Sequence, residues 1–268
     1  MPTIERPGAS IHWQDAGDGT PLLLIMGLRY SSAMWYPVIP SHAAEHRVVW
    51  FDNQGTGKSG ARSTTTVSEM ADDALAVLDA AGVESAHVYG VSMGGGIAME
   101  LALRAPDRVR SLILGCTAIK TEVVPALSDL QVRILKSTPG PIKRLVAKRG
   151  YGSAAPAEAV RRDLAMLSKD PFTWEGVVAQ QRAVAAYSTD ASLVAGIDVP
   201  VLVVHGTEDK TVPYAAGQHI AATIPGARLV TIEGAGHNYF VAGGEQANRE
   251  TLAFLARIDA TAPAAASP

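Results

Sequence analysis

The sequence has almost no cysteine, no long apolar run and no excess of basic residues. Its 268 residues include one cysteine, Cys116, which excludes an internal disulfide and a zinc site built from several cysteines. Apolar runs are strand-sized and fall well short of the ~18–20 residues that a membrane-spanning helix needs. The first residues lack the charged and then apolar pattern of a secretory signal peptide. We therefore expect a cytoplasmic protein with no membrane partner.

The charge balance argues against a nucleic-acid partner. The chain carries 23 Lys and Arg against 26 Asp and Glu, a net charge of -3, whereas nucleic-acid binding requires a clustered basic excess. Residues 120–196 differ from the rest, with 11 basic against 7 acidic side chains. This local surplus fits either a solvated helix surface or a lid that favours anionic substrates.

Short apolar runs alternate with longer segments of helical periodicity. The apolar runs predict buried strands, and their near-continuous apolar character indicates a parallel sheet covered on both faces. Helices are expected between the strands, because apolar residues there recur at one-face helical spacing. The predicted strands are 22–26, 48–51, 87–91, 112–115, 199–205 and 228–232, and the predicted helices are 67–81, 93–104, 215–223 and 245–257.

One segment interrupts the alternation. Residues 120–196 contain about four helical patterns separated by prolines and no convincing strand. We interpret the segment as a helical lid inserted into a core made of residues 1–119 and 197–268. Within it, Met166, Trp174 and Tyr187 either line a substrate pocket or pack the lid onto the core.

A nucleophile pattern lies where a predicted strand meets a predicted helix. Residues 90–94 read Gly-Val-Ser-Met-Gly, the G-x-S-x-G pattern, in the strand–turn–helix context that a nucleophile elbow requires. A serine at so sharp a turn tolerates only small neighbours, which Gly90 and Gly94 supply. The helix that begins at Met93 directs free N–H groups toward Ser92. Ser92 is therefore the predicted nucleophile.

A serine nucleophile needs a base and an acid that orients the base. His237 lies on a glycine-rich loop just after the strand 228–232, and Asp209 follows the strand 199–205. Loops at the carboxyl ends of parallel strands are where sites form in open α/β sheets. The order Ser92, Asp209, His237 is that of the α/β-hydrolases. Glu208 is the alternative acid.

An oxyanion site is expected beside the serine. The strand 22–26 ends in a loop that could supply one backbone N–H, from Leu28, and the helix after Ser92 could supply another, from Met93. One such donor typically contributes about 3–4 kcal/mol to lowering the barrier.

These motifs together resemble the α/β-hydrolase fold superfamily. The resemblance rests on Met26-Gly27 followed by Trp35, and on residues 51–59, 90–95, 205–213 and 234–237, in that order. It covers essentially the whole chain, with residues 120–196 matching the helical lid. Within the superfamily the chain is similar to small ester and lactone hydrolases such as enol-lactonases and methylesterases.

Two positions depart from the family pattern. The family usually has His-Gly at the oxyanion strand end, whereas this chain has Met26-Gly27, which implies a more apolar pocket with Met26 against the substrate. Gln54 replaces the arginine of the Asp-x-Arg-Gly-x-Gly-x-Ser turn, so a charge and an ion pair near the cleft are expected to be lost. The serine nucleophile separates the chain from epoxide hydrolases and dehalogenases of this fold, which use an aspartate.

Other motifs compete with this interpretation. Residues 57–59 resemble the end of a phosphate-binding P-loop but lack its first glycine. His42 and His46 fit a zinc-peptidase spacing, and we interpret them as solvated residues at a helix end. His205 is expected to pack near Asp209 or to hydrogen-bond backbone, and Cys116 to be a buried thiol.

The sequence thus predicts a serine hydrolase that acts on a carboxylic ester or lactone of a small, largely apolar molecule. It would form an acyl-enzyme on Ser92 and use no metal or organic cofactor. Three alternatives remain open at this stage: hydrolysis of a C–C bond in a diketone-type substrate, a hydrolase-fold ligand receptor with slow turnover, and an acyl transferase.

Overall fold

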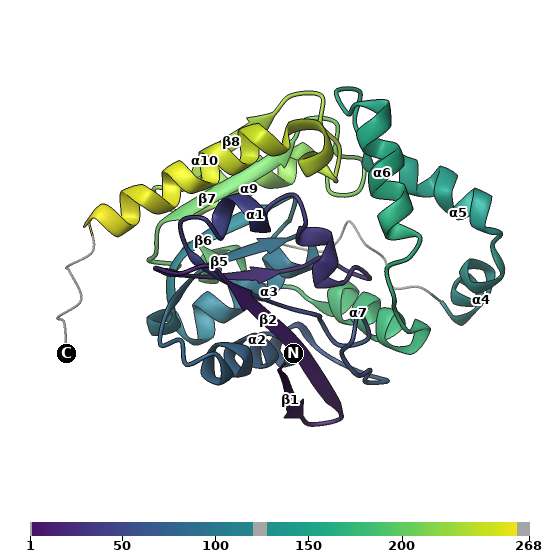
Figure 1. Cartoon of the computed structure of the whole chain (residues 1–268), viewed down its shortest axis with the longest axis horizontal. Helices are drawn as coiled ribbons and strands as arrows, with labels where there is room; N and C mark the ends of the chain where they lie inside the picture. Colours follow the sequence, from purple (N-terminus) through teal and green to yellow (C-terminus); the bar gives the residue numbers. More distant parts are fainter. Residues whose placement is uncertain (1, 120–127, 262–268) are drawn as a thin grey trace.

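The computed structural model describes residues 2–119 and 128–261. Its centre is an eight-stranded sheet with the order β1-β2-β4-β3-β5-β6-β7-β8 (Figure 1). The strands from β3 to β8 run parallel, and β2 joins them in antiparallel pairing with β4. The strand bounds are β1 Thr3–Arg6, β2 Ala9–Ala16, β3 Pro21–Ile25, β4 Arg47–Phe51, β5 Ala86–Val91, β6 Val109–Gly115, β7 Val201–Gly206 and β8 Arg228–Ile232.

The antiparallel hairpin β1–β2 was missed by the sequence analysis. Both strands mix polar and apolar residues, so neither presents the apolar run that marks the central strands. The signal that could have revealed them is the Pro7-Gly8 pair, because Gly8 has φ 77°, a left-handed conformation suited to a tight turn.

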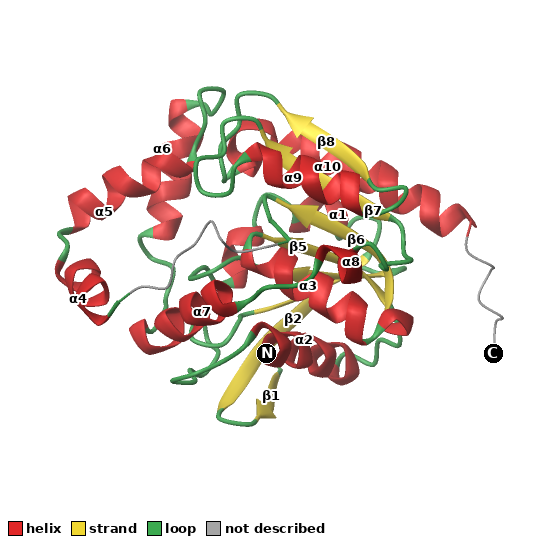
Figure 2. Ribbon diagram, turned by 180° about the vertical axis from the view of Figure 1, so that it is seen from behind, coloured by secondary structure: helices red, strands yellow, loops and turns green. Residues whose placement is uncertain are grey.

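Helices cover both faces of the sheet, as predicted (Figures 1 and 2). They are α1 Ile39–His42, α2 Val67–Ala80, α3 Met93–Arg104, α9 Tyr214–Thr223 and α10 Tyr239–Thr261, with 3₁₀ turns at Ser32–Trp35, Pro106–Arg108 and Lys148–Gly150. Alternate strand residues enter two separate cores, because successive strand side chains point to opposite faces. Leu23 and Ile25 pack with α2 and α3, whereas Leu22 and Leu24 pack on the α10 side.

The predicted starts of two helices can be compared with the structure. Thr66 caps α2 in a reciprocal capping box with Glu69, so the helix begins where the sequence predicted. Helix α10 begins earlier than the predicted residue 245, at Tyr239, and continues past Gly243, whose backbone is not helical. No helix among the described residues is both long and apolar enough to cross a membrane.

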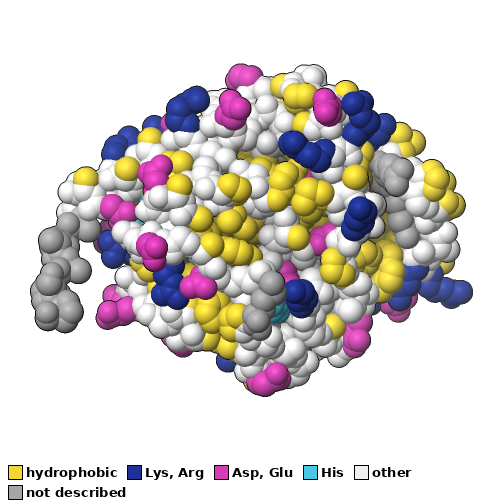
Figure 3. All heavy atoms as spheres, viewed as in Figure 1, with side chains coloured by type: hydrophobic (Ala, Val, Ile, Leu, Met, Phe, Trp, Pro, Cys, Tyr) yellow, Lys and Arg dark blue, Asp and Glu magenta, His cyan; other side chains and the backbone are white. Residues whose placement is uncertain are grey.

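The described residues between β6 and β7 are helical, in agreement with the sequence analysis. They form α4 Asp129–Ser137, α5 Gly140–Ala147, α6 Ala157–Leu167, α7 Trp174–Ala186 and α8 Ala191–Val194. Residues 120–127 of the predicted lid lie outside the described part of the chain. Hydrophobic and basic side chains lie together along the edge of the molecule where α4 and α5 are found (Figure 3).

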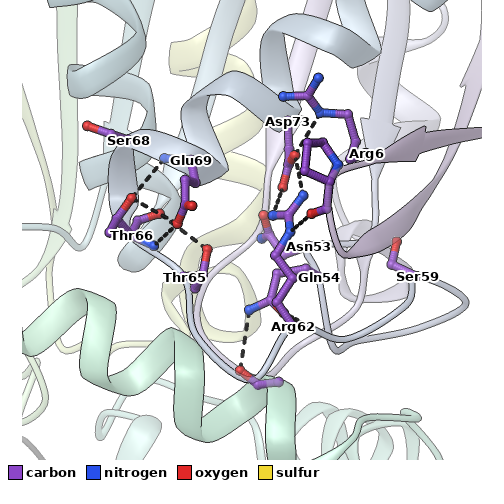
Figure 4. A network of polar contacts seen from close by, with 12 residues as sticks. Arg6, Asn53, Gln54, Ser59, Arg62, Thr65, Thr66, Ser68, Glu69 and Asp73 are labelled. Carbon is purple, nitrogen blue, oxygen red and sulfur yellow. Dashed lines mark hydrogen bonds and ion pairs between the residues drawn. The ribbon is translucent and has the colours of Figure 1, made fainter.

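Gln54 connects the loop after β4 to helix α7. Its side chain is buried, donates to the carbonyl of Gly176 at 3.4 Å and accepts from the backbone N–H of Arg62 at 2.9 Å (Figure 4). Two ion pairs lie close to this loop. Arg62 and Arg6 both bind the buried carboxylate of Asp73. Gln54 itself carries no charge, and the ion pairs described beside this loop are made by arginines at other positions.

Candidate active site

Ser92 occupies a strained turn between β5 and α3. Its φ is 54°, a left-handed value that a non-glycine residue rarely adopts. A Cβ at Gly90 would lie 2.1 Å from the carbonyl oxygen of Gly94, and a Cβ at Gly94 would lie 2.1 Å from that of Ile25. Only glycine fits at either position, as the sequence pattern predicts for an elbow.

The structure brings Ser92, His237 and Asp209 together in a hydrogen-bonded chain. His237 Nε2 lies 3.1 Å from Ser92 Oγ, and His237 Nδ1 lies 2.7 Å from Asp209 Oδ2. The three residues come from positions up to 145 apart in the sequence. Glu208, the alternative acid, instead accepts hydrogen bonds from the backbone N–H and the hydroxyl of Ser153. Asp209 is the acid that contacts His237.

Asp209 is held as a carboxylate by several donors. Its Oδ1 accepts from the backbone N–H groups of Thr211 and Val212 at 2.8 and 2.9 Å. Burial would raise the pKa of Asp209, but hydrogen bonds from His205 and His237 outweigh it and hold the pKa well below its usual value. His205 Nε2 lies 2.9 Å from the carbonyl of Val212 and 3.3 Å from Asp209, which confirms both expectations for this residue.

Cys116 lies next to His237, which the sequence analysis did not foresee. It is buried, as expected of a thiol here, and it follows β6 with φ 40°. Burial favours the neutral form of His237, whereas the sulfur of Cys116 and the carboxylate of Asp209 favour the imidazolium. Their combined effect raises the pKa of His237 above its ordinary value.

The two residues predicted to donate to an oxyanion lie near Ser92. Leu28 and Met93 line the same cavity as Ser92. Met93 is the first residue of α3. Gly27 lets the loop approach, since a Cβ there would lie 3.2 Å from Ser92 Cβ.

Two buried amide side chains hold this loop, and sequence reasoning missed both. Asn53 Nδ2 donates to the carbonyl of Met26 at 2.9 Å, and the backbone N–H of Arg29 donates to Gln180 Oε1 at 2.9 Å. Arg29 has φ 77°, a conformation that needs support from its surroundings. The Gly27–Leu28 peptide therefore lies between two peptides that are each fixed by a side chain.

A cavity of about 590 Å³ opens beside Ser92. Most of its lining is apolar, and Met26 belongs to it as predicted. The structure places Met166, Trp174 and Tyr187 outside that lining. Trp174 packs edge-on against Phe172 with ring centroids 5.3 Å apart, and Met166 packs against the core on the α10 side. Tyr187 faces a separate groove beside the start of α2.

The competing motifs have structural explanations. His42 and His46 are buried, so the expectation of solvated histidines is wrong. His42 bonds the carbonyl of Val38 and the hydroxyl of Thr251, and His46 lies 3.6 Å from Asp259. The loop that resembles a P-loop is filled by the carboxylate of Asp52, which accepts from the backbone N–H groups of Ser32 and Lys58 at 2.8 Å.

Comparisons with known proteins agree with this geometry. A family model described as alpha/beta hydrolase fold matches residues 20–173, and one described as TAP-like protein matches residues 174–265. A protein of Azorhizobium caulinodans, named provisionally as carbamate hydrolase RutD, is 32% identical over 97% of this chain and 100% of its own length. A similarly named protein of Variovorax paradoxus is also 32% identical, over 93% of this chain and 97% of its own length.

Solved structures show the same resemblance. A thermophilic esterase from Thermogutta terrifontis is 27% identical, with a TM-score of 0.83 over 96% of this chain and 97% of that one. The enol-lactonase from Burkholderia xenovorans is 25% identical, with a TM-score of 0.83 over 95% of this chain and 100% of that one.

Proposed function

The chain belongs to the α/β-hydrolase fold family, and from this premise we propose that it is a serine hydrolase that cleaves a carboxylic ester or lactone of a small, largely apolar molecule. Hydrolase activity itself follows from its relatives. The observation that carries the finer proposal is the chain of hydrogen bonds from Ser92 through His237 to Asp209.

The geometry supports acyl transfer in two stages. Ser92 Oγ attacks the carbonyl carbon while His237 Nε2 takes the hydroxyl proton, and Asp209 holds His237 Nδ1–H and stabilises the imidazolium. The backbone N–H groups of Leu28 and Met93 bind the oxyanion. The C–O bond then breaks, and His237 passes its proton to the leaving alkoxide. Water attacks the acyl-enzyme as His237 removes its proton, which releases the acid and restores Ser92.

The cavity supports the proposed substrate class. Its lining includes Met26, Met34 and Phe240, which suit an apolar acyl or alcohol group. Ala147 of α5 and Leu167 of α6 also line it. On this basis we assign residues 120–196 the role of a lid over a core of residues 1–119 and 197–268.

Carbamate hydrolysis is the second candidate function. It is favoured by the name carried by the relatives that are 32% identical. The same serine would attack the carbamate carbonyl, and a carbamoyl group would take the place of the acyl group on Ser92. Carbamate and ester substrates presented in one panel would separate the two candidates.

A serine-directed reagent tests the proposal. The purified protein is treated with a small fluorophosphonate, in which the serine oxygen displaces fluoride from phosphorus, and is then weighed intact. We expect one adduct in the wild type and in Cys116→Ala, and none in Ser92→Ala. Ser92→Ala should also lower ester turnover at least about 10³-fold with an unchanged melting temperature. An adduct that persists in Ser92→Ala, or full turnover by that variant, would remove the mechanism.

A further inference from the structure

The described lining of the catalytic cavity contains one acidic residue, Asp163 of helix α6. Asp163 is 3% exposed. The hydroxyl of Tyr36 donates to its Oδ1 at 2.9 Å, and the hydroxyl of Tyr151 donates to its Oδ2 at 2.5 Å. Each carboxyl oxygen therefore has one neutral donor.

The other buried carboxylates of the described residues have more donors. Asp73 binds two arginines, and Asp209 binds two histidines as well as two backbone N–H groups. Asp52 accepts from the backbone N–H and the hydroxyl of Ser32 and from the backbone N–H of Lys58. Asp163, by contrast, takes part in none of the ion pairs between side chains that the structure describes. A carboxylate offers about four acceptor positions, and the two tyrosine hydroxyls fill two of them. Leaving the other positions unfilled is costly in a buried site.

The two tyrosines keep these positions available. Burial and the neighbouring Asp163 raise the pKa of Tyr36 to about 12, and the same two causes raise the pKa of Tyr151. Both hydroxyls thus keep their protons at neutral pH and act as donors to Asp163. The carboxyl group is consequently fixed in place and does not need to reorganise when a ligand arrives.

We propose that Asp163 accepts a hydrogen bond from an N–H group of the substrate. The charge of the cavity lining favours an uncharged N–H donor over an ammonium. Arg29, Arg149 and Lys210 also border the cavity and would repel an ammonium. The substrate class is then an acyl compound that carries a carboxamide-type N–H away from the bond that is cut. This inference rests on the proposed hydrolase function, since it concerns a substrate that Ser92 attacks.

A substrate pair that differs only in the donor tests the role. We would compare p-nitrophenyl esters whose acyl chains end in a primary carboxamide with esters that end in the isosteric methyl ketone, over chains of two to five methylenes. A third series ends in an ammonium group. At the best chain length we expect kcat/KM to favour the carboxamide about 10- to 100-fold over the ketone, as for a hydrogen bond to a charged acceptor. The ammonium ester should rank below the carboxamide ester.

The variants separate recognition from structural support. Asp163→Asn should lose at least tenfold of the carboxamide preference while the methyl ketone ester keeps its kcat/KM within about twofold. Tyr36→Phe removes a donor but retains the carboxyl group, so the preference should remain. Equal losses for both esters in Asp163→Asn, or no carboxamide preference at any length in the wild type, would overturn the proposal.

A binding measurement without turnover tests the role of Asp163 separately from the proposed hydrolase function. Calorimetric titration of Ser92→Ala with hexanamide and with 2-heptanone, which replaces the amide nitrogen by a methyl group, needs no hydrolysis. Tighter binding of hexanamide that disappears in Ser92→Ala/Asp163→Asn supports the role of Asp163 even if no ester is hydrolysed. Equal affinities for the two compounds contradict that role even if every ester is a substrate.

Discussion

The histidines of this chain differ in pKa because their surroundings differ. His237 lies between a carboxylate and a sulfur, and its pKa is raised. His42 has no carboxylate partner among the described residues, and burial lowers its pKa to about 4. A raised pKa makes His237 a stronger base that is neutral, and hence active, only at higher pH.

The pH profile of the reaction tests the effect of Cys116. We expect kcat/KM for an ester to rise with pH to a plateau, since the neutral imidazole is the base, with a midpoint above the ordinary histidine value of about 6.5. Cys116→Ala should move the midpoint to lower pH because it removes a group that favours the imidazolium. The measurement is kcat/KM between pH 5 and 10. An unmoved midpoint would show that Cys116 does not contribute to the pKa of His237.

Among the secondary-structure elements, the helices between β6 and β7 differ in how firmly they join the core. The start of α7 is tied to the loop after β4, because Thr173 N–H donates to Gly55 O and Gly57 N–H donates to Pro171 O, both at 2.8 Å. Helices α4 and α5 instead expose large apolar side chains, namely Leu130, Ile134, Leu135, Ile142, Leu145 and Val146. Helix α7 is therefore a firmly attached part of the proposed lid.

Gln180 connects α7 to the loop that carries Leu28, the proposed oxyanion donor. Besides accepting from Arg29 N–H, its Nε2 donates to Gln54 O at 2.7 Å, and the side chain is fully buried. Gln180→Leu should lower kcat about tenfold with little change in KM, a part of the 10²–10³-fold that a whole oxyanion donor contributes.

The control for Gln180 lies on the same helix. Arg182→Ala removes an exposed side chain that pairs with Asp129, and it should keep kcat within about twofold. Gln180→Leu also leaves a buried N–H and C=O unpaired, so its melting temperature should fall. A lower melting temperature with unchanged kcat would mean that Gln180 supports the fold and does not position the loop.

Across the whole molecule, buried neutral histidines connect stability to pH. Burial is the leading cause of the lowered pKa of His12, His42 and His87. His87 Nε2 lies 3.1 Å from Asp259 of α10, and His42 binds Thr251 of the same helix. Two buried histidines therefore contact α10 from the rest of the fold, and burial is the main reason that each has a lowered pKa.

Acid should weaken the fold before the carboxylates titrate. Each of these histidines has a lower pKa folded than unfolded, so the unfolded state binds more protons and the free energy of unfolding falls as pH drops below about 6.5. For His42 the loss continues to about pH 4 and amounts to at most about 3 kcal/mol.

Urea denaturation at several pH values measures this loss. His42→Gln should flatten the decline of the unfolding free energy between pH 6.5 and 4, whereas His219→Gln, at an exposed position, should leave the slope unchanged. A wild-type protein of constant stability across this range would contradict the assignment of buried neutral histidines.

The sequence by itself determined the parts of this protein that depend on neighbours along the chain. The apolar runs predicted the parallel strands, and Gly90 and Gly94 predicted the elbow at Ser92, because strand and turn preferences act over a few residues. Asp209 and His237 could be predicted too, since the ends of parallel strands meet at one edge of a sheet. The mixed polar pattern of β1 and β2 left no comparable signal.

Only the tertiary structure decided which distant side chains meet. Gln180 contacts a loop 151 residues away, and Asp163 reaches Tyr36 across 127 residues. Trp174 turns from the predicted pocket to Phe172, and Cys116 comes to lie beside His237. The packing of α6 and α7 against the core sets these contacts, and the periodicity of a single helix carries no information about which segment will cover its buried face.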